Sequence, residues 1–155
     1  MLLTVCTDDD DLRNVAVAQA ASQRPIFGYC YHSFEWRIPP LQADENLFIT
    51  AHGAFNSDRV EPPQPIIGDH DAWLWLTGED LFANLRDIIP TDYHGAVYIS
   101  ACESADGDAG TPSFAQSLLR TFREFGYDRI RVYGHRGEVG LLTPPPGDPD
   151  WVQAN

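Results

Sequence analysis

Two residues of this sequence have the types and the spacing of a nucleophile and its base. His52 follows an apolar run and precedes Gly53, and Cys102 follows another apolar run about 50 residues later. A cysteine attacks a carbonyl carbon as a thiolate, and a nearby imidazole favours that form by accepting the proton. We therefore expect His52 to be the general acid/base and Cys102 the nucleophile of an acyl-transfer reaction.

The residues next to this pair fit the same chemistry. Acyl transfer needs hydrogen-bond donors for the carbonyl oxygen that becomes negatively charged. We expect the backbone N–H groups of Gly53 and Cys102 to be these donors, because Gly53 has no side chain in the way. Small residues precede the cysteine in Ser100-Ala101-Cys102, so a peptide backbone could approach it closely.

The elements that must position these residues alternate between strand and helix. Alternation of this kind predicts an α/β fold: a mostly parallel, doubly wound sheet with helices on both faces, a Rossmann-like three-layer sandwich. The predicted strands are Leu2–Cys6, Asn46–Ala51, Gly95–Ala101 and Arg129–Gly134, and the predicted helices are Leu12–Ser22, Thr77–Ile89 and Ser113–Phe125. In such sheets, ligands bind outside the carboxyl ends of the strands. If the second and third of these strands are neighbours, His52 and Cys102 emerge side by side.

Other segments are less regular. Residues Ile26–Phe34 alternate loosely and predict a second strand, at the sheet edge if anywhere, and Glu138–Leu142 predicts a shorter one. Residues Asn56–Asp71 are rich in proline and acids and predict a long loop. We expect residues 1–142 to form one domain and residues 143–155 an irregular C-terminal tail.

The amino-acid composition restricts the classes of binding partner to expect. The net charge is −13 with only ten Lys and Arg among 155 residues, which disfavours nucleic acid and anionic membranes, since both need clustered basic residues. A basic peptide would be attracted, although solubility alone explains the charge equally well. With three cysteines, no signal-peptide pattern and no membrane-length apolar run, we expect a cytoplasmic protein or an effector secreted without a signal peptide.

These residues resemble a known family. An apolar strand ending in His-Gly, followed about 50 residues later by one ending in Ala-Cys, is similar to the caspase-like cysteine peptidases. The caspase pentapeptide Gln-Ala-Cys-Arg-Gly is not met, because this chain has Ser-Ala-Cys-Glu-Ser. The run Ile99–Ser104, followed by Gly110 and Ser113–Ala115, resembles the CHAT-type and toxin-autoprocessing branch, and the resemblance covers roughly Asn46–Gly134.

The resemblance implies a caspase-like fold and a His52–Cys102 dyad that cleaves protein or peptide substrates, with no metal and no organic cofactor. It implies limited proteolysis or self-processing in a bacterial setting. Relatives that cleave after basic residues hold the substrate side chain with acids, so we expect Asp8 or Asp9 to contribute to such a pocket, together with Ala101 and His135. A helix cap explains the two acids equally well.

Two alternatives remain open at this point. The chain resembles the family but is short, so it could be a catalytically weak or inactive caspase-like module that binds a protein partner. It could instead be a cysteine-dependent hydrolase of a small amide or ester. The run Asp69-His70-Asp71 could bind a cation, but its spacing matches no firm metal pattern and favours a polar loop.

Overall fold

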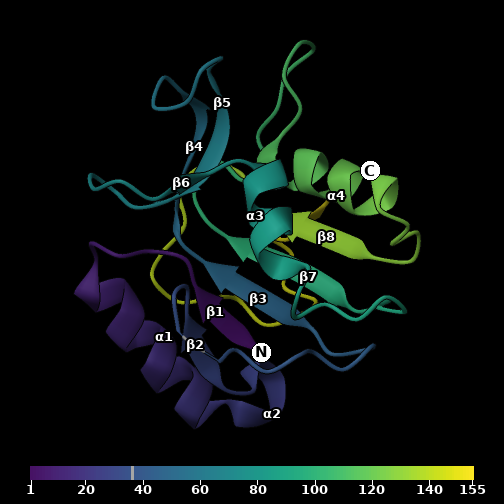
Figure 1. Ribbon diagram of the computed structural model, residues 1–155. Coiled ribbons are helices and arrows are strands. Elements are labelled where there is room, and N and C mark those ends of the chain that lie inside the picture. Colours follow the sequence, from purple (N-terminus) through teal and green to yellow (C-terminus); the bar gives the residue numbers. More distant parts are fainter. Residues whose placement is uncertain (36) are drawn as a thin grey trace.

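The computed structural model describes residues 1–35 and 37–155, which form an α/β fold built on a mostly parallel six-stranded sheet (Figure 1). The strands are β1 (Leu2–Thr4), β2 (Cys30–His32), β3 (Leu47–Thr50), β4 (His52–Ser57), β5 (Gln64–Gly68), β6 (Trp75–Leu76), β7 (Ala96–Ser100), β8 (Arg131–Gly134) and β9 (Val152–Gln153). The helices are α1 (Asp10–Ser22), α2 (Arg24–Phe27), α3 (Gly78–Leu85) and α4 (Phe114–Glu124).

The large sheet has the strand order β2-β1-β3-β7-β8-β9. All neighbouring pairs are parallel except β8 and β9, so the arrowheads of β1, β3, β7 and β8 point the same way in Figure 1. The chain leaves β1 toward β2 and then returns past β1 to β3, which makes the β1/β3 boundary the switch point of the sheet. Ligand sites in open α/β sheets lie at the carboxyl ends of strands beside such a boundary.

Both faces of this sheet are covered, which explains the apolar runs in the sequence. Successive side chains of a strand point to opposite faces. In β3, Leu47 and Ile49 pack with α3 and α4, whereas Phe48 packs with α1 and α2. Tyr98 and Val97 of β7 divide between the two faces in the same way. The predicted three-layer arrangement with helices on both faces is therefore confirmed.

The helices begin where their capping residues predict. The side chain of Asp9 accepts the Leu12 N–H at the start of α1, and Thr77 and Ser113 form capping boxes at the starts of α3 and α4. These bonds satisfy N–H groups that the first helical turn leaves unpaired. Across the described ranges, the chain contains no helix with the length and apolarity needed to cross a membrane.

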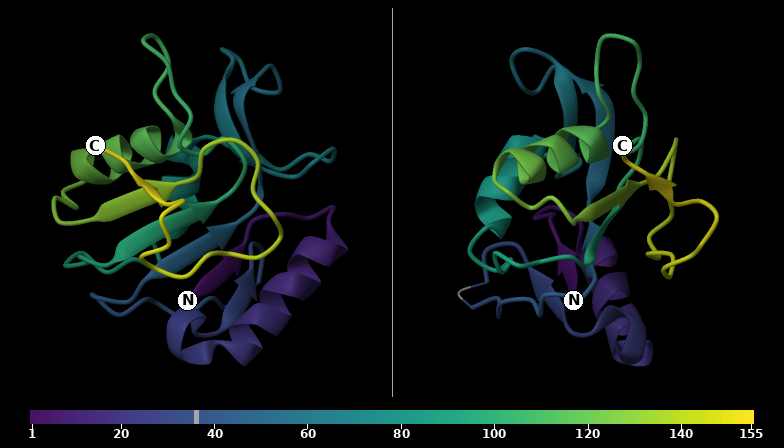
Figure 2. Two further views of the ribbon diagram at one scale, coloured as in Figure 1. Left: turned by 180° about the vertical axis from the view of Figure 1, so that it is seen from behind. Right: turned by 90° about the vertical axis from the view of Figure 1, so that its right-hand side faces the viewer.

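The C-terminal residues 143–155 are mostly irregular but are part of the packed structure. They run back across the α1 face of the sheet and end in β9 beside β8 (Figure 2). Trp151 packs on Tyr98, with ring centroids 5.0 Å apart. The buried Gln19 of α1 exchanges two hydrogen bonds with the backbone of Thr143. The segment thus covers the part of this face that α1 leaves open.

Three of the expected elements differ from the structure. Residues Asn56–Asp71, expected as a long loop, include the end of β4 and all of β5, which pair antiparallel and add β6 as a third strand. Ile26–Phe34 is a strand only at Cys30–His32, an edge position, because its first residues belong to the short helix α2, which has Pro25 in its first turn. In the described chain Glu138–Leu142 forms no strand, since β9 occupies the position beside β8.

Candidate functional site

The two predicted catalytic residues lie at the same edge of the sheet. Strands β3 and β7 are parallel neighbours, and Thr50 is in register with Ser100. His52 and Cys102 each follow two residues after that pair, so equal distances along neighbouring strands bring them to the same edge. The prediction that the His and Cys strands are adjacent is confirmed.

His52 and Cys102 are both among the residues that line one open pocket of about 400 Å³. Its walls come from the β4–β5 hairpin, from β6 and from the segments after β7 and β8. The lining residues are His52, Gly53, Ala54, Ser57, Arg59, Ile66, Ile67, Gly68, Asp69, His70, Trp75, Cys102, Glu103 and Glu138. The hairpin that sequence reasoning missed thus supplies much of the site.

Gly53 brings the His52 and Cys102 segments into direct contact. A Cβ atom on Gly53 would lie 2.3 Å from the carbonyl oxygen of Cys102 and 3.2 Å from its backbone nitrogen. Real Cβ atoms essentially never come that close to backbone, so this position requires glycine. The residue after the histidine therefore packs against the backbone of the cysteine, as a shared oxyanion site would require.

The Cys102 thiol is half-buried and has a hydrogen-bond donor. The N–H of Val139, from the segment after β8, points to Cys102 Sγ at 3.4 Å. The next residue, Glu103, has a positive φ of 57°, a conformation that is uncommon outside glycine and often occurs at functional sites. Its carboxylate accepts the N–H of Phe55 in β4 at 2.8 Å. A sharp, anchored turn thus presents the sulfur to the pocket.

The side chain of Ser104 holds this turn in place through two hydrogen bonds. Its buried hydroxyl donates to the carbonyl of Ile99 at 3.0 Å and accepts the N–H of His135 at 2.9 Å. These bonds join the turn after β7 to the segment after β8, so the Cys102 backbone is tied to two strands of the sheet.

His52 is oriented by a carboxylate from another element. Its Nε2 lies 2.9 Å from Oδ2 of Asp9, the residue that caps α1. The ring of His70 packs edge-on against the imidazole, with ring centroids 5.2 Å apart. About a quarter of each partner in the His52–Asp9 pair is exposed (28% and 25%), so the pair is sheltered but reachable.

A second cysteine also lies near His52. The Cys6 sulfur, a carboxylate oxygen of Asp8 and a ring nitrogen of His52 are all within 4.8 Å of one another. Burial raises the pKa of the Cys6 thiol to about 11, and its S–H points to Asp8 at 3.3 Å. A thiol of this kind is almost entirely protonated at neutral pH and is a poor nucleophile.

The same three residues are a weak candidate for a metal site. The Asp8 carboxylate accepts the backbone N–H groups of His70, Asp71 and Ala72 as well as the Cys6 thiol. Four donors fill the acceptor positions of its two oxygens, and these N–H bonds, that of Asp71 first, lower the pKa of Asp8. A cation would have to displace those bonds, so we assign no metal here.

Asp69 connects the loop after β5 to the loop after β1, in the direction opposite to Asp8. Its buried carboxylate accepts the N–H and the hydroxyl of Thr7 and the N–H groups of Trp73 and Leu74. Burial alone would raise the pKa of Asp69, but these hydrogen bonds outweigh it and lower that pKa. With Asp8 reaching the opposite way, the loops after β1 and β5 hold each other; we call this pair of residues the Asp8/Asp69 clamp.

The four residues expected in a substrate pocket occupy other positions. Asp8 belongs to the clamp and Asp9 contacts His52, while Ala101 is fully buried in the core. His135 is 5% exposed and packs at a tilt against Trp151, with ring centroids 4.1 Å apart, and burial lowers its pKa. None of the four is among the described residues that line the pocket around Cys102.

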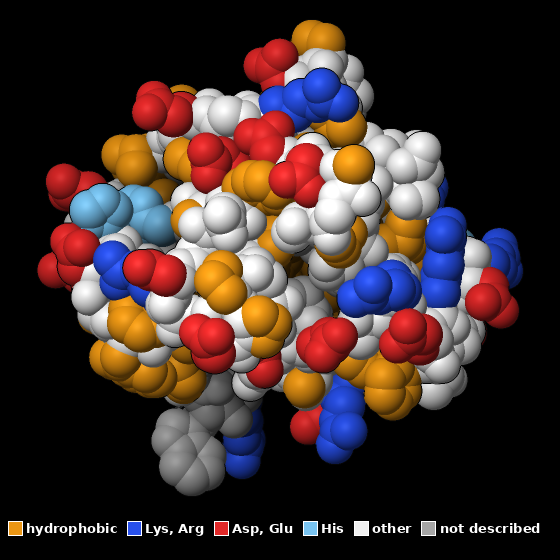
Figure 3. Space-filling view, turned by 90° about the horizontal axis from the view of Figure 1, so that it is seen from above, with side chains coloured by type: hydrophobic (Ala, Val, Ile, Leu, Met, Phe, Trp, Pro, Cys, Tyr) orange, Lys and Arg blue, Asp and Glu red, His pale blue; other side chains and the backbone are white. Residues whose placement is uncertain are grey.

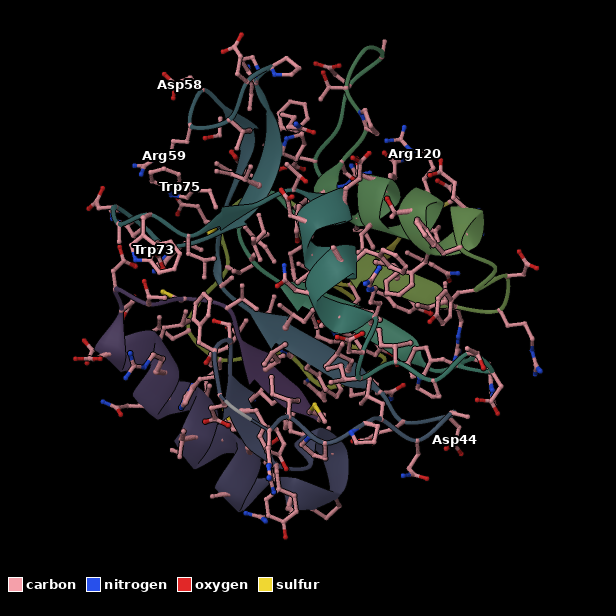
Figure 4. The ribbon with its side chains drawn as sticks, in the orientation of Figure 1. Asp44, Asp58, Arg59, Trp73, Trp75 and Arg120 are labelled. Atoms are coloured by element: carbon pink, nitrogen blue, oxygen red, sulfur yellow. The ribbon has the colours of Figure 1, made fainter. Side chains whose placement is uncertain are left out.

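The pocket wall contains charged residues of both signs. Arg59 stacks over the Trp75 ring at 4.7 Å, and the two lie side by side in Figure 4. The guanidinium also pairs with Asp71 at 3.5 Å. Glu103 and Glu138 line the pocket on the Cys102 side. Figure 3 shows acidic side chains spread over the face seen from above, with histidines gathered at one side.

Sequence reasoning missed Asp69 and Val139 as supporting residues. Asp69 was part of a run that suggested only a polar loop, and nothing in a sequence marks one carboxylate as buried. Val139 acts through its backbone N–H, which any residue type would provide. Comparison with known proteins adds no assignment: no family profile, curated protein or solved structure matches this chain.

Proposed function

We propose that this protein is a cysteine endopeptidase of the caspase-like type, which uses His52 and Cys102 for limited proteolysis or self-processing. The observation that carries the proposal is the junction at Gly53, where the residue after the histidine lies against the Cys102 backbone and both His52 and Cys102 line one pocket. The parallel sheet with adjacent His and Cys strands is what the family resemblance predicts, and it supports the proposal.

The chemistry follows from the groups in the pocket. Cys102 transfers its proton to His52, and the sulfur attacks the scissile carbonyl carbon. The N–H groups of Gly53 and Cys102 stabilise the oxyanion. When the tetrahedral intermediate collapses, the C–N bond breaks and His52 protonates the leaving amine. Water, deprotonated by His52, then attacks the thioester, and the acid product and the free thiol are released.

The reactive thiol is Cys102 rather than Cys6. Cys6 is 3% exposed and has a pKa raised to about 11, so little thiolate forms there. Cys102 is half-buried at the pocket, and the Val139 N–H points at its sulfur. Because thiolate is the attacking species, this contrast selects Cys102.

The pocket charges suggest which substrates suit the site. Arg59 is already paired with Asp71, whereas Glu103 and Glu138 lie on the side of the nucleophile. Together with the net charge of −13, this favours peptides with basic residues near the scissile bond over acidic ones.

A thiol-reactive peptide probe tests the function. We expect an acyloxymethyl ketone on a basic peptide to label the purified protein at one site, which Cys102→Ala abolishes and Cys6→Ala leaves intact. His52→Ala should slow labelling at least about 100-fold, the scale of general acid/base catalysis. Labelling of wild type no faster than that of His52→Ala would contradict the proposal.

Matched substrates separate this function from the two alternative functions. Peptide amides with Arg, Asp or Leu before the scissile bond are compared with small esters of the same residues. Hydrolysis of the esters alone would indicate a small-molecule hydrolase. No turnover of either class, with a folded protein by circular dichroism, would indicate a non-catalytic module instead.

A further inference from the structure

The carboxylate of Asp9 is aimed at His52 from an element outside the dyad. Asp9 precedes α1, whereas His52 begins β4, 43 residues further along the chain. Their Oδ2 and Nε2 atoms are 2.9 Å apart. Because an ionised carboxylate only accepts hydrogen bonds, the Nε2 atom must carry the hydrogen in this contact.

The other oxygen of the same carboxylate is fixed by the helix. Asp9 Oδ1 accepts the Leu12 N–H at 2.9 Å, and the residue has the extended backbone of an N-cap (φ −127°, ψ 97°). The two oxygens therefore have separate partners. The cap fixes the carboxylate in direction, and the free oxygen faces the imidazole.

The charge state of Asp9 suits this arrangement. The Leu12 hydrogen bond, followed by the contact with His52, lowers the pKa of Asp9 and keeps it ionised. A fixed carboxylate at one ring nitrogen holds one tautomer and one orientation of a histidine ring. With Nε2 bonded to Asp9, Nδ1 is the ring nitrogen left to exchange a proton with a thiol.

We propose that Asp9 is a positioning residue that fixes the orientation and the Nε2–H tautomer of His52, so that Nδ1 serves Cys102. As a catalytic device the proposal rests on the proposed function, but the tautomer itself does not. Asp8 cannot take this role because its oxygens are filled by the backbone of residues 70–72 and by Cys6. His70 contributes a ring contact but no hydrogen bond to His52 within residues 1–35 and 37–155.

Two substitutions separate positioning from helix capping. Asp9→Ser keeps a good N-cap but is too short to reach His52. Asp9→Asn keeps both the cap and an acceptor but removes the charge. Asp80→Asn is the matched control, because Asp80 caps α3 at Thr77 and does not line the pocket.

Nitrogen NMR of labelled histidine gives the direct readout. In the Cys102→Ala background, where the thiol cannot interfere, we expect His52 at pH 9 to show the Nε2–H tautomer. Asp9→Ser should shift it to a mixture, and Asp80→Asn should leave it unchanged. An Nδ1–H tautomer, or a tautomer unaffected by Asp9→Ser, would overturn the proposal.

Kinetics then tests the catalytic consequence. With Cys102 present, Asp9→Ser should lower kcat about tenfold to hundredfold with KM changed less than about twofold, and Asp9→Asn should have an intermediate effect. Wild-type kcat in both variants would refute the positioning role in catalysis. If wild type has no activity but the tautomer depends on Asp9, the positioning stands and the peptidase function fails.

Discussion

Cys6 and Cys102 both follow the carboxyl end of a strand at the same edge of the sheet, and both lie near His52, but they sit in different environments. Around Cys6, the Asp8/Asp69 clamp closes two loops over the thiol and burial raises its pKa to about 11. Around Cys102, a turn with positive φ at Glu103 presents a half-buried sulfur to an open pocket.

This contrast teaches that proximity to a histidine does not make a cysteine reactive. The region around Cys6 uses its polar groups to hold loops together, so that His52 and Asp9 have a firm support. The region around Cys102 leaves this residue half-buried beside an open pocket and directs the Val139 N–H at its sulfur. The four predictions below test the difference, beginning with the largest expected effect.

The first prediction concerns alkylation rates. At pH 7.5, with a pKa of about 11, fewer than about one in a thousand Cys6 thiols is ionised. We expect iodoacetamide to modify Cys102 at least about 100-fold faster than Cys6 in the native protein, measured by mass spectrometry of the cysteine peptides. Cys30, half-buried with a pKa also raised to about 11, is the internal control. The rates should converge in urea, and equal native rates would remove the contrast.

The second prediction concerns the junction between the His and Cys segments. Gly53→Ala places a methyl group 2.3 Å from the Cys102 carbonyl oxygen, so the two backbones must separate. We expect about 3 kcal/mol less stability in urea unfolding and loss of Cys102 labelling. Gly140→Ala, where nothing lies within 4 Å, should change neither. A Gly53→Ala protein with wild-type stability and labelling would show that the close contact is not needed.

The third prediction concerns the clamp. Asp69→Asn replaces a carboxylate that accepts four hydrogen bonds by an amide whose NH₂ group can only donate. We therefore expect the free energy of unfolding at pH 7 to fall by about 2 kcal/mol. Because the folded-state pKa of Asp69 is depressed, its stabilisation is present above the ordinary carboxyl value of about 3.9 and is lost as pH falls through the folded-state pKa.

Urea midpoints of wild type and Asp69→Asn should therefore differ at pH 6 and converge toward pH 3. The exposed Asp8 is the matched comparison, and Asp8→Asn should lower the stability less than Asp69→Asn does at every pH. If the difference in urea midpoint between wild type and Asp69→Asn stays constant with pH, the effect does not come from the ionised carboxylate.

The smallest expected effect concerns the anchor of the Cys102 turn. Ser104→Ala removes the hydroxyl that bonds to Ile99 and accepts the His135 N–H. We expect about 1 kcal/mol less stability and slower probe labelling, because the turn that presents the sulfur is less firmly held. Unchanged labelling at reduced stability would mean that the turn keeps its shape without this anchor.

Much of the scaffold could be predicted because its determinants are local in the chain. The apolar runs before His52 and Cys102 specify strands buried on both faces, and the capping residues Thr77 and Ser113 mark helix starts. The β4–β5 hairpin was missed because Pro62, Pro63 and Pro65 favour a loop. Such a segment becomes a strand only by pairing with a neighbouring strand, and that pairing is set by the tertiary structure.

By itself, the sequence determined the α/β class and the expectation that His52 and Cys102 emerge at one sheet edge, because strand direction and residue spacing carry that information. Only the tertiary structure decided that Asp9 faces His52 while Asp8 and Asp69 join loops. Adjacent carboxylates are chemically alike, and their roles differ only through the hydrogen-bond donors that folding brings to each.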